Sequence, residues 1–461
     1  MSQPLLSQNL ESIKLQTLAK DTTVAIIIQV GGRAVTYLSV VFLAQWMGET
    51  EYGIYEYVIS WSLLLAIIAG IGYPRTVLRF VVEYRIKQDW GRLRGIVWSS
   101  WLIIVLAGLL ISVVGTGAIW LLNHYHSFTY ATPLLIGIWL VPLQALVYLQ
   151  LETMRAMEDI TLAYIPSQII WPVLVLCGGF LLLKKNHSLT SVPMISMATL
   201  VLLPVVLFQL WLLWNKLNKE VKPATPVYAH REWLGVSLVL LLQYAFASIL
   251  SQTDILMVGS ILGPSEAGIY SAAVKTAMWT NVILQTVNMA AAPMFTTLYT
   301  QGDLQGLQKV ISIVTLWIFW PTLAIVFILV VFAEPVLGIF GSEFVAGSWA
   351  LKILVLGQMI NALCGSVNIL MTMTGHQNKS VVVFGCAVLI NLVLNAFAIP
   401  LLGAVGASIA TAFAMMVWNI WLSVLVVRNV GVNPSVFSLL LSKKDDSKLI
   451  NQLKSGASTS D

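Results

Sequence analysis

Two long stretches of the chain contain no Asp, Glu, Lys or Arg: Gly95 to Leu151 and Ser380 to Val427. A membrane-spanning helix needs about 20 apolar residues, because each residue adds about 1.5 Å of length. Each stretch therefore holds two spans and a turn. The chain of 461 residues is only 10% charged, which is too little to cover the surface of a soluble protein. The sequence predicts an integral membrane protein.

About twelve transmembrane helices are expected, which predicts an all-α polytopic membrane protein. The apolar runs are continuous, whereas the strands of a membrane barrel alternate apolar and polar residues. The expected spans are 22–47, 53–73, 95–122, 130–151, 161–183, 190–214, 234–262, 266–292, 310–333, 350–372, 380–400 and 404–427.

The positions of the cations predict the orientation of the chain. With the N-terminus in the cytoplasm, all 25 Lys and Arg residues fall in cytoplasmic segments except Lys184, Lys185, Lys352, Arg33 and Lys275. Lys and Arg concentrate on the cytoplasmic side of membrane proteins. We therefore expect both termini to be cytoplasmic. This bias explains the formal net charge of +5, so no nucleic-acid partner is expected.

A short motif occurs twice. Gly48-x-x-Glu51-x-Gly53-Ile54-Tyr55 recurs 215 residues later (263 − 48) as Gly263-x-x-Glu266-x-Gly268-Ile269-Tyr270. A chance match in apolar sequence is one explanation. However, each copy lies at the outer turn between an odd and an even span, which favours a parallel repeat. We expect two six-helix lobes around a central cavity, 1–218 and 219–429, followed by a cytoplasmic tail at 430–461.

Three charged residues lie within the expected spans: Arg33, Lys275 and Asp254. A charge in the hydrocarbon is costly unless it faces a cavity or a partner. One interpretation is that Arg33 and Lys275 face the cavity and bind an anionic headgroup, while Asp254 balances their charge or carries a coupling ion. The alternative is an ion pair that fixes helix packing, between Asp254 and either Lys275 or Arg33.

Polar residues accompany these charges. Gln29 precedes Arg33 by four residues and shares its helix face, while Asn281, Gln285 and Asn288 form a stripe on span eight. We assign these four to the substrate-binding cavity, although hydrogen bonding between helices is an equal alternative. Glu56 lies one turn into span two and is a second candidate for ion coupling or charge balance. Glu51 and Glu266 are expected to cap helix starts.

Motifs for covalent chemistry are lacking in the sequence. It contains no phosphate-binding loop, no Ser/His/Asp order and no metal motif, and its three cysteines lie apart in apolar segments. We therefore expect neither an enzyme nor a cofactor, apart from a coupling H⁺ or Na⁺ ion.

Several segments carry a resemblance to a known family. Thr253-Asp254-Ile255-Leu256-Met257-x-Gly259 and the following Leu262-Gly263-Pro264-x-Glu266-x-Gly268-Ile269-Tyr270-Ser271-Ala272-Ala273 resemble the span-seven/eight signature of polysaccharide biosynthesis flippases. These are the O-antigen and exopolysaccharide transporters of the multidrug/oligosaccharidyl-lipid/polysaccharide exporter superfamily. Gly341-x-x-Phe344, Met373-Thr374-Gly375-His376 and Gly403-Ala404-Val405-Gly406-Ala407 agree with it too.

The resemblance implies alternating access, with a lipid-linked oligosaccharide of the undecaprenyl-pyrophosphate type moved across a bacterial cytoplasmic (inner) membrane. Implied partners are this anionic glycan, membrane lipid, and glycosyltransferases or polymerases. One alternative is an exporter of the multidrug and toxin extrusion type, although cationic drugs prefer acidic cavities. The other is a membrane glycosyltransferase, ligase or polymerase, for which the short outer loops offer few catalytic candidates.

Overall fold

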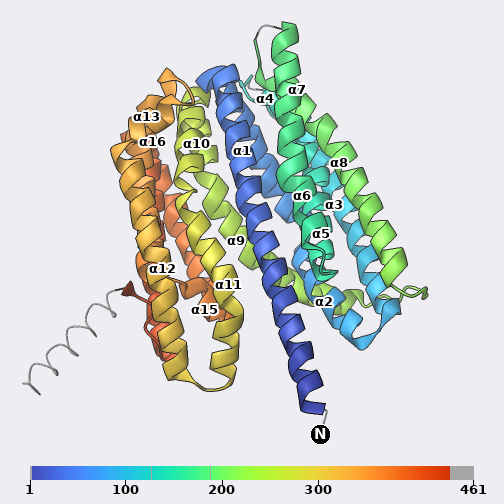
Figure 1. The fold of residues 1–461 in the computed structure, drawn as a ribbon. Coiled ribbons are helices and arrows are strands. Elements are labelled where there is room, and N and C mark those ends of the chain that lie inside the picture. The colour runs from blue at the N-terminus through green and yellow to red at the C-terminus, as the bar shows by residue number, and fades with distance from the viewer. Residues whose placement is uncertain (1–2, 126, 187, 437–461) are drawn as a thin grey trace, which may run out of the picture. The chain divides into compact units, whose positions relative to one another are not determined.

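The computed structural model describes residues 3–125, 127–186 and 188–436; for 3–25, 186 and 243 only the backbone is described. Every regular element in this part of the chain is a helix, which confirms the all-α class (Figure 1). Nine of these described helices are long and apolar enough to cross a membrane. The chain is a multi-pass membrane protein.

Packing divides the chain into two compact units. The first comprises Met1–Ala272 and Leu337–Ala346, and the second comprises Ala273–Val336 and Gly347–Asp461. This division differs from the predicted boundary at residue 218, which rests on the internal repeat and stays a prediction. Most of the predicted tail, 430–461, lies outside the described residues.

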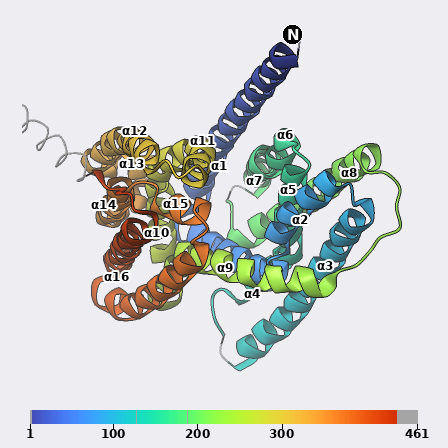
Figure 2. The same ribbon diagram turned by 90° about the horizontal axis from the view of Figure 1, so that it is seen from below.

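Most of the first unit comes from the N-terminal part of the chain. Its helices are α1 (Gln3–Gly70), α2 (Tyr73–Lys87), α3 (Trp90–Tyr125), α4 (Ala131–Gly137), α5 (Leu140–Ala156), α6 (Ile160–Ile165), the π-helical η1 (Pro166–Ile170), α7 (Trp171–Asn186), α8 (Ser191–Glu220), α9 (His230–Leu262) and most of α10 (Pro264–Ala277). In this unit α5 packs against α1, α2, α3 and α8 (Figure 2).

The second unit contains α11 (Thr280–Thr300), α12 (Leu304–Val331), most of α13 (Ala333–Gly338), α14 (Ser348–Cys364), α15 (Val367–Met373) and α16 (Gln377–Val430). A 3₁₀ turn, η2 (Ser342–Gly347), and the end of α13 pack with the first unit instead. Buried residues of α11, α12, α15 and α16 form the core of the second unit, including Phe295, Ile311, Leu370 and Leu422.

Glycines create the turns between paired spans. The backbone of α1 is non-helical at Gly48, with φ 73°, and that of α16 is non-helical at Gly403, with φ 63°. Such positive φ angles are strained for residues that carry a Cβ. Each of these helices is therefore two spans joined at a kink. With α10 and α11 forming a further, broken span, the structure agrees with the twelve spans expected.

Three expected spans are not continuous helices. The span at 130–151 is interrupted at Ile138–Trp139, where α4 ends before α5 begins. The span at 266–292 is interrupted at Met278–Trp279, where α10 ends before α11 begins. The span at 350–372 is interrupted at Gly365, whose φ of 70° ends α14 before α15. Hydropathy is high on both sides of each break and does not report backbone conformation, so the sequence did not indicate where the helices break.

Candidate functional site

The repeated motif brings two backbones together within the first unit. A Cβ atom added at Gly53 on α1 would lie 1.8 Å from the carbonyl oxygen of Pro264. A Cβ atom added at Gly268 on α10 would lie 2.1 Å from the carbonyl oxygen of Glu49. The repeat offset relates Gly53 to Gly268 and Glu49 to Pro264, so the two contacts are equivalent. Chance does not explain this reciprocity, and the repeat is a structural one.

The acidic residues of the motif serve helix starts. The backbone N–H of Ser191 donates to Glu51 Oε2 at 2.6 Å, which caps the beginning of α8. Glu266 lies in the first turn of α10, where a negative charge stabilises the helix dipole. The capping role predicted for Glu51 is confirmed, although the capped helix comes from a distant part of the sequence.

Two carboxylates are buried beside tyrosines of the same hairpins. Glu56 and Asp254 are only 3% and 4% exposed. The Tyr52 hydroxyl donates to Glu56 Oε1 at 3.1 Å, and the Tyr270 hydroxyl donates to Asp254 Oδ2 at 3.3 Å. Burying a carboxylate is costly unless hydrogen bonds or counter-charges compensate it. These two residues therefore differ from the exposed acids of the loops.

The helix that carries Asp254 is held against α1 at a glycine. The Tyr130 hydroxyl donates to the carbonyl oxygen of Gly259 at 2.8 Å, and the hydroxyls of Tyr57 and Ser260 lie 2.9 Å apart. The rings of Tyr57 and Tyr130 stack, with centroids separated by 4.0 Å. Because Gly259 has no side chain, the Tyr57 ring approaches the backbone of α9 closely; a Cβ atom at Gly259 would lie 2.6 Å from Cδ2 of Tyr57.

Arg33 and Gln29 lie half-buried on the first half of α1. The neighbouring Gly32 packs closely on η1, because a Cβ atom there would lie 2.9 Å from Cβ of Gln168. Arg33 therefore lies on a long apolar helix, within the candidate span Ile26–Gly70. Its spacing of four residues from Gln29 puts both side chains on one helix face.

The remaining candidates belong to the second unit. Lys275 is half-buried on α10, and Asn281, Gln285 and Asn288 lie on α11, beyond the break. Gln285 is exposed, and Oδ1 of Asn288 is buried without a hydrogen-bond partner among the described residues. The stripe therefore lies on one helix, but Lys275 does not share that helix. A pocket shared with Arg33 stays a prediction.

Other amides within the spans join helices. Asn419 on α16 donates to Asn361 on α14, and Asn391 in the first half of α16 donates to Thr411 in the second half at 3.2 Å. Two further contacts lie within single helices, since Asn361 donates to Gln358 at 2.7 Å and Asn395 donates to Asn391 at 3.1 Å. The first two contacts join helices, and neither involves the α11 stripe.

One buried ionic cluster was not predictable from the sequence. Glu152 is 6% exposed and lies 3.3 Å from Arg75 Nη1 and 2.7 Å from Arg155 Nη1. The guanidinium of Arg75 also lies over the ring of Tyr244, 5.2 Å from its centroid. The cluster joins α2, α5 and α9. Glu152 directly follows the first charge-free stretch, a signal that places it at a span end but does not reveal its partners.

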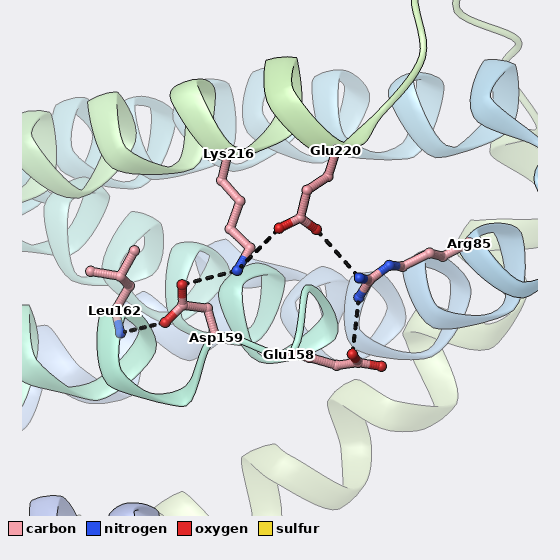
Figure 3. A network of polar contacts seen from close by, with 6 residues as sticks. All are labelled: Arg85, Glu158, Asp159, Leu162, Lys216 and Glu220. Carbon is pink, nitrogen blue, oxygen red and sulfur yellow. Dashed lines mark hydrogen bonds and ion pairs between the residues drawn. The ribbon is translucent and has the colours of Figure 1, made fainter. Parts of the chain in front are cut away.

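A second ionic network joins the end of α8 to neighbouring segments (Figure 3). Lys216 Nζ lies 2.9 Å from Asp159 and 3.5 Å from Glu220, and Glu220 lies 3.3 Å from Arg85. Asp159 also caps α6, because it accepts from the Leu162 N–H at 3.1 Å. Each such pair near the surface adds little stability by itself. As a network they tie α2, α6 and α8 together.

An exposed pair on α2 shows the expected electrostatics outside the membrane. A hydrogen bond of 2.6 Å from the Lys87 ammonium lowers the pKa of Glu83 and raises the pKa of Lys87. Both groups therefore stay charged over a wider pH range than they would alone.

Comparison with known proteins identifies the family. The family model described as polysaccharide biosynthesis protein matches residues 18–299, more than half of the chain. The chain belongs to the polysaccharide biosynthesis protein family. A second family model, MatE, matches residues 240–397.

Relatives agree with this assignment. The chain is 24% identical over 406 residues to the probable low-salt glycan biosynthesis flippase Agl15 of Haloferax volcanii, covering 87% of this chain and 81% of the relative. The expected resemblance to the polysaccharide flippase family is therefore confirmed, and the chain is a membrane transporter of this family.

Solved structures share the fold. An inward-facing multidrug resistance MATE-family transporter of the MOP superfamily superposes with a TM-score of 0.67 at 14% identity, covering 86% of this chain and 96% of that chain. A MOP superfamily transporter from Pyrococcus furiosus, described as having a binding pocket of reverse polarity, gives 0.64 at 14% identity, covering 88% and 93%. At this identity the similarity indicates the fold alone.

Proposed function

We propose that this member of the polysaccharide biosynthesis family moves a lipid-linked oligosaccharide across the cytoplasmic membrane by alternating access. The substrate class is a glycan on a polyprenyl pyrophosphate, of the undecaprenyl type in a bacterium. Family membership supports the transport of a glycan, and the name of the Haloferax relative supports flipping rather than synthesis.

The observation that carries the proposal is the position of Arg33. It lies half-buried on α1, in a candidate span that runs from Ile26 to Gly70 and is rich in apolar residues. A guanidinium within an apolar span faces a cavity or a partner, and its planar donors suit a pyrophosphate. Lys275 adds a second, mobile positive charge, and the amides of α11 provide donors and acceptors for sugar hydroxyls.

The two buried carboxylates provide a means of coupling. Glu56 and Asp254 each accept a hydrogen bond from a tyrosine and lie on hairpins related by the repeat. In this proposal the two carboxylates bind H⁺ or Na⁺ in one state of the transport cycle. In the other state they balance the positive charges of Arg33 and Lys275. Glycosyltransferases and polymerases would supply and consume the substrate on opposite sides of the membrane.

Substitution of the two cations tests the proposal. In a strain that lacks its own transporter, Arg33→Gln and Lys275→Gln should each lower surface polysaccharide at least tenfold, because a hydrogen bond to a charged group contributes about 1.5–3 kcal/mol. Arg33→Lys should restore part of the activity, since it retains the charge. Surface polysaccharide is quantified per amount of membrane-inserted protein.

Lys352→Gln is the matched control. Lys352 lies on α14 with its ammonium 4.8 Å from the ring centroid of Trp349, and the proposal gives it no role in the cavity. Wild-type polysaccharide in this variant is expected. Wild-type polysaccharide in both Arg33→Gln and Lys275→Gln would refute the cationic-cavity mechanism.

A second candidate function is export of small molecules, favoured by the MatE match over residues 240–397. The positive charges at Arg33 and Lys275 argue against cationic drugs as substrates. Drug-susceptibility profiles of a deletion strain distinguish the two functions. Hypersensitivity with normal surface polysaccharide would favour the exporter.

A further inference from the structure

One groove in the first unit is not used by the proposed transport mechanism. It lies between α3 and α8, which both pack against α5, and it encloses about 390 Å³. Its principal lining residues are Arg94, Trp98 and Trp101 on α3 and Trp211, Trp214 and Asn218 on α8. Trp98 and Trp214 make an edge-to-face contact across it, with ring centroids 5.3 Å apart.

The groove changes from polar to apolar along its length. Arg94 lies close to the end of α8, because its Nη2 donates to the carbonyl oxygen of Val221 at 3.3 Å. Trp98 and Trp101 follow four and seven residues later, about 6 and 10 Å along the helix. Beyond Arg94, the charge-free stretch from Gly95 to Leu151 begins. One end of the groove thus carries a cation, and the other is lined by tryptophan and leucine.

Two donors in the groove have no partner among the described residues. The Nε of Arg94 and the indole Nε1 of Trp101 are both buried and make no hydrogen bond. Unpaired buried donors are costly, so a rotation of either side chain that brings its donor to an acceptor outside the chain is favourable. A phosphate matches the guanidinium, and an ester carbonyl matches the indole N–H.

The surroundings define the occupant. The groove is formed by two candidate membrane spans, Trp90–Tyr125 and Ser191–Glu220, so lipid is the molecule that reaches it. Trp211 is 57% exposed and Trp98 is 50% exposed. Tryptophans at such positions mark the level of the headgroups and the first carbons of the chains.

We infer that this groove is a binding site for one anionic phospholipid of the leaflet that faces the arginine-rich side of the protein. The phosphate binds Arg94, the ester region lies at Trp101, and an acyl chain packs along Trp98, Trp211 and Trp214. Occupancy would brace α3 against α8, which have few direct backbone contacts. The inference does not depend on the identity of the transported substrate.

Quenching of tryptophan fluorescence tests this site. The full-length chain is reconstituted in phosphatidylcholine bilayers that contain a minor fraction of dibrominated phosphatidylglycerol or, in parallel, of dibrominated phosphatidylcholine. The fluorescence of the wild-type protein should be quenched more strongly by the anionic lipid, because the groove concentrates that lipid beside four of the 17 tryptophans. Arg94→Gln should weaken the apparent affinity for phosphatidylglycerol about fivefold, the effect of one cation near an anionic surface.

Arg92→Gln is the matched control. Arg92 is exposed on the same helix, pairs with Asp89 and does not line the groove. It should retain the excess quenching. Trp211→Leu is a second variant, which removes an exposed side chain that lines the groove but keeps Arg94. It should also reduce the excess quenching.

Three results would overturn the inference. Equal quenching by the two lipids would show that the groove does not select an anion. An equal loss in Arg92→Gln and Arg94→Gln would assign the preference to general surface charge. Displacement of brominated phosphatidylglycerol by undecaprenyl phosphate at much lower concentration than by unlabelled phosphatidylglycerol would assign the groove to a polyprenyl lipid.

Discussion

At the scale of single residues, the sequence predicted which charged groups are costly to bury, but not which partners compensate the cost of burial. Arg33 and Asp254 were identifiable because few charges interrupt the apolar spans. Tyr52 precedes Glu56 by four residues on one helix, so that contact follows from helical spacing. The tyrosine that donates to Asp254 was not identifiable as a partner, because this contact depends on how α10 packs against α9. Glu152 was missed for the same reason, since its partner Arg75 is distant in sequence.

Glu152 gives the first prediction at this scale. Glu152→Gln removes the charge that compensates Arg75 and Arg155, and it should lower stability by roughly 1–3 kcal/mol, a value limited by the partial exposure of both arginines. The thermal unfolding midpoint of the purified protein measures this effect. Glu158→Gln is the control, because the Glu158 side chain is 81% exposed. Equal midpoints for the two variants would contradict the structural role of the cluster.

Gly53 and Gly268 give the second prediction. Gly53→Ala or Gly268→Ala would place a methyl group about 2 Å from a backbone carbonyl oxygen, and such overpacking costs about 1–3 kcal/mol or more. Both variants should melt at lower temperature and yield less protein in the membrane. Gly117→Ala is the control, since nothing lies within 4 Å of a Cβ atom there. A melting temperature unchanged by Gly53→Ala would contradict the close crossing.

At the scale of elements, hydropathy predicted where helices lie but not where they break. The gaps at Met278–Trp279 and Gly365 lie inside apolar runs, and only backbone packing reveals them. Conversely, α2 forms in a segment that the sequence predicted as a connection between two spans. The family motif Gly341-x-x-Phe344 has a structural explanation at this scale, because Phe344 is fully buried and its ring contacts Tyr52 edge-to-face at 6.0 Å.

The third prediction concerns this short segment. Phe344→Ala should destabilise the packing of 337–346 on α1, at a cost of about 3–5 kcal/mol for a buried phenylalanine. Ile339→Ala is the control within the segment, because Ile339 is 56% exposed. Limited proteolysis of both variants in detergent measures the effect. If Phe344→Ala and Ile339→Ala are cleaved at the same rate, the segment is not anchored by this ring.

At the scale of the whole molecule, the fold class, the number of spans and the family could all be predicted from sequence. These properties depend on composition, periodicity and motif spacing, which are local. The position of Lys275 relative to Arg33 depends on how the two units are arranged, and no local pattern determines it. The shared pocket therefore remains a prediction that functional assays must test.

The orientation in the membrane is the fourth prediction. In a variant with Cys177, Cys364 and Cys386 replaced by Ser, a cysteine in place of Thr225, between α8 and α9, should react with a membrane-impermeant maleimide only after the cells are opened. A cysteine at Lys185 should react in intact cells. The cation distribution requires this result. The reverse pattern would place both termini outside.

The crossing of Gly53 with Gly268 also has a consequence for the history of the chain. Each glycine excludes a side chain because it faces the backbone of the other copy, so a mutation in either copy is felt by its counterpart. An ancestor with a single copy would have met the same restriction at the axis of a symmetric dimer, where one glycine faces its own twin. Duplication of such an ancestor would leave the rest of each half free to diverge, while these two positions would still have no room for a side chain.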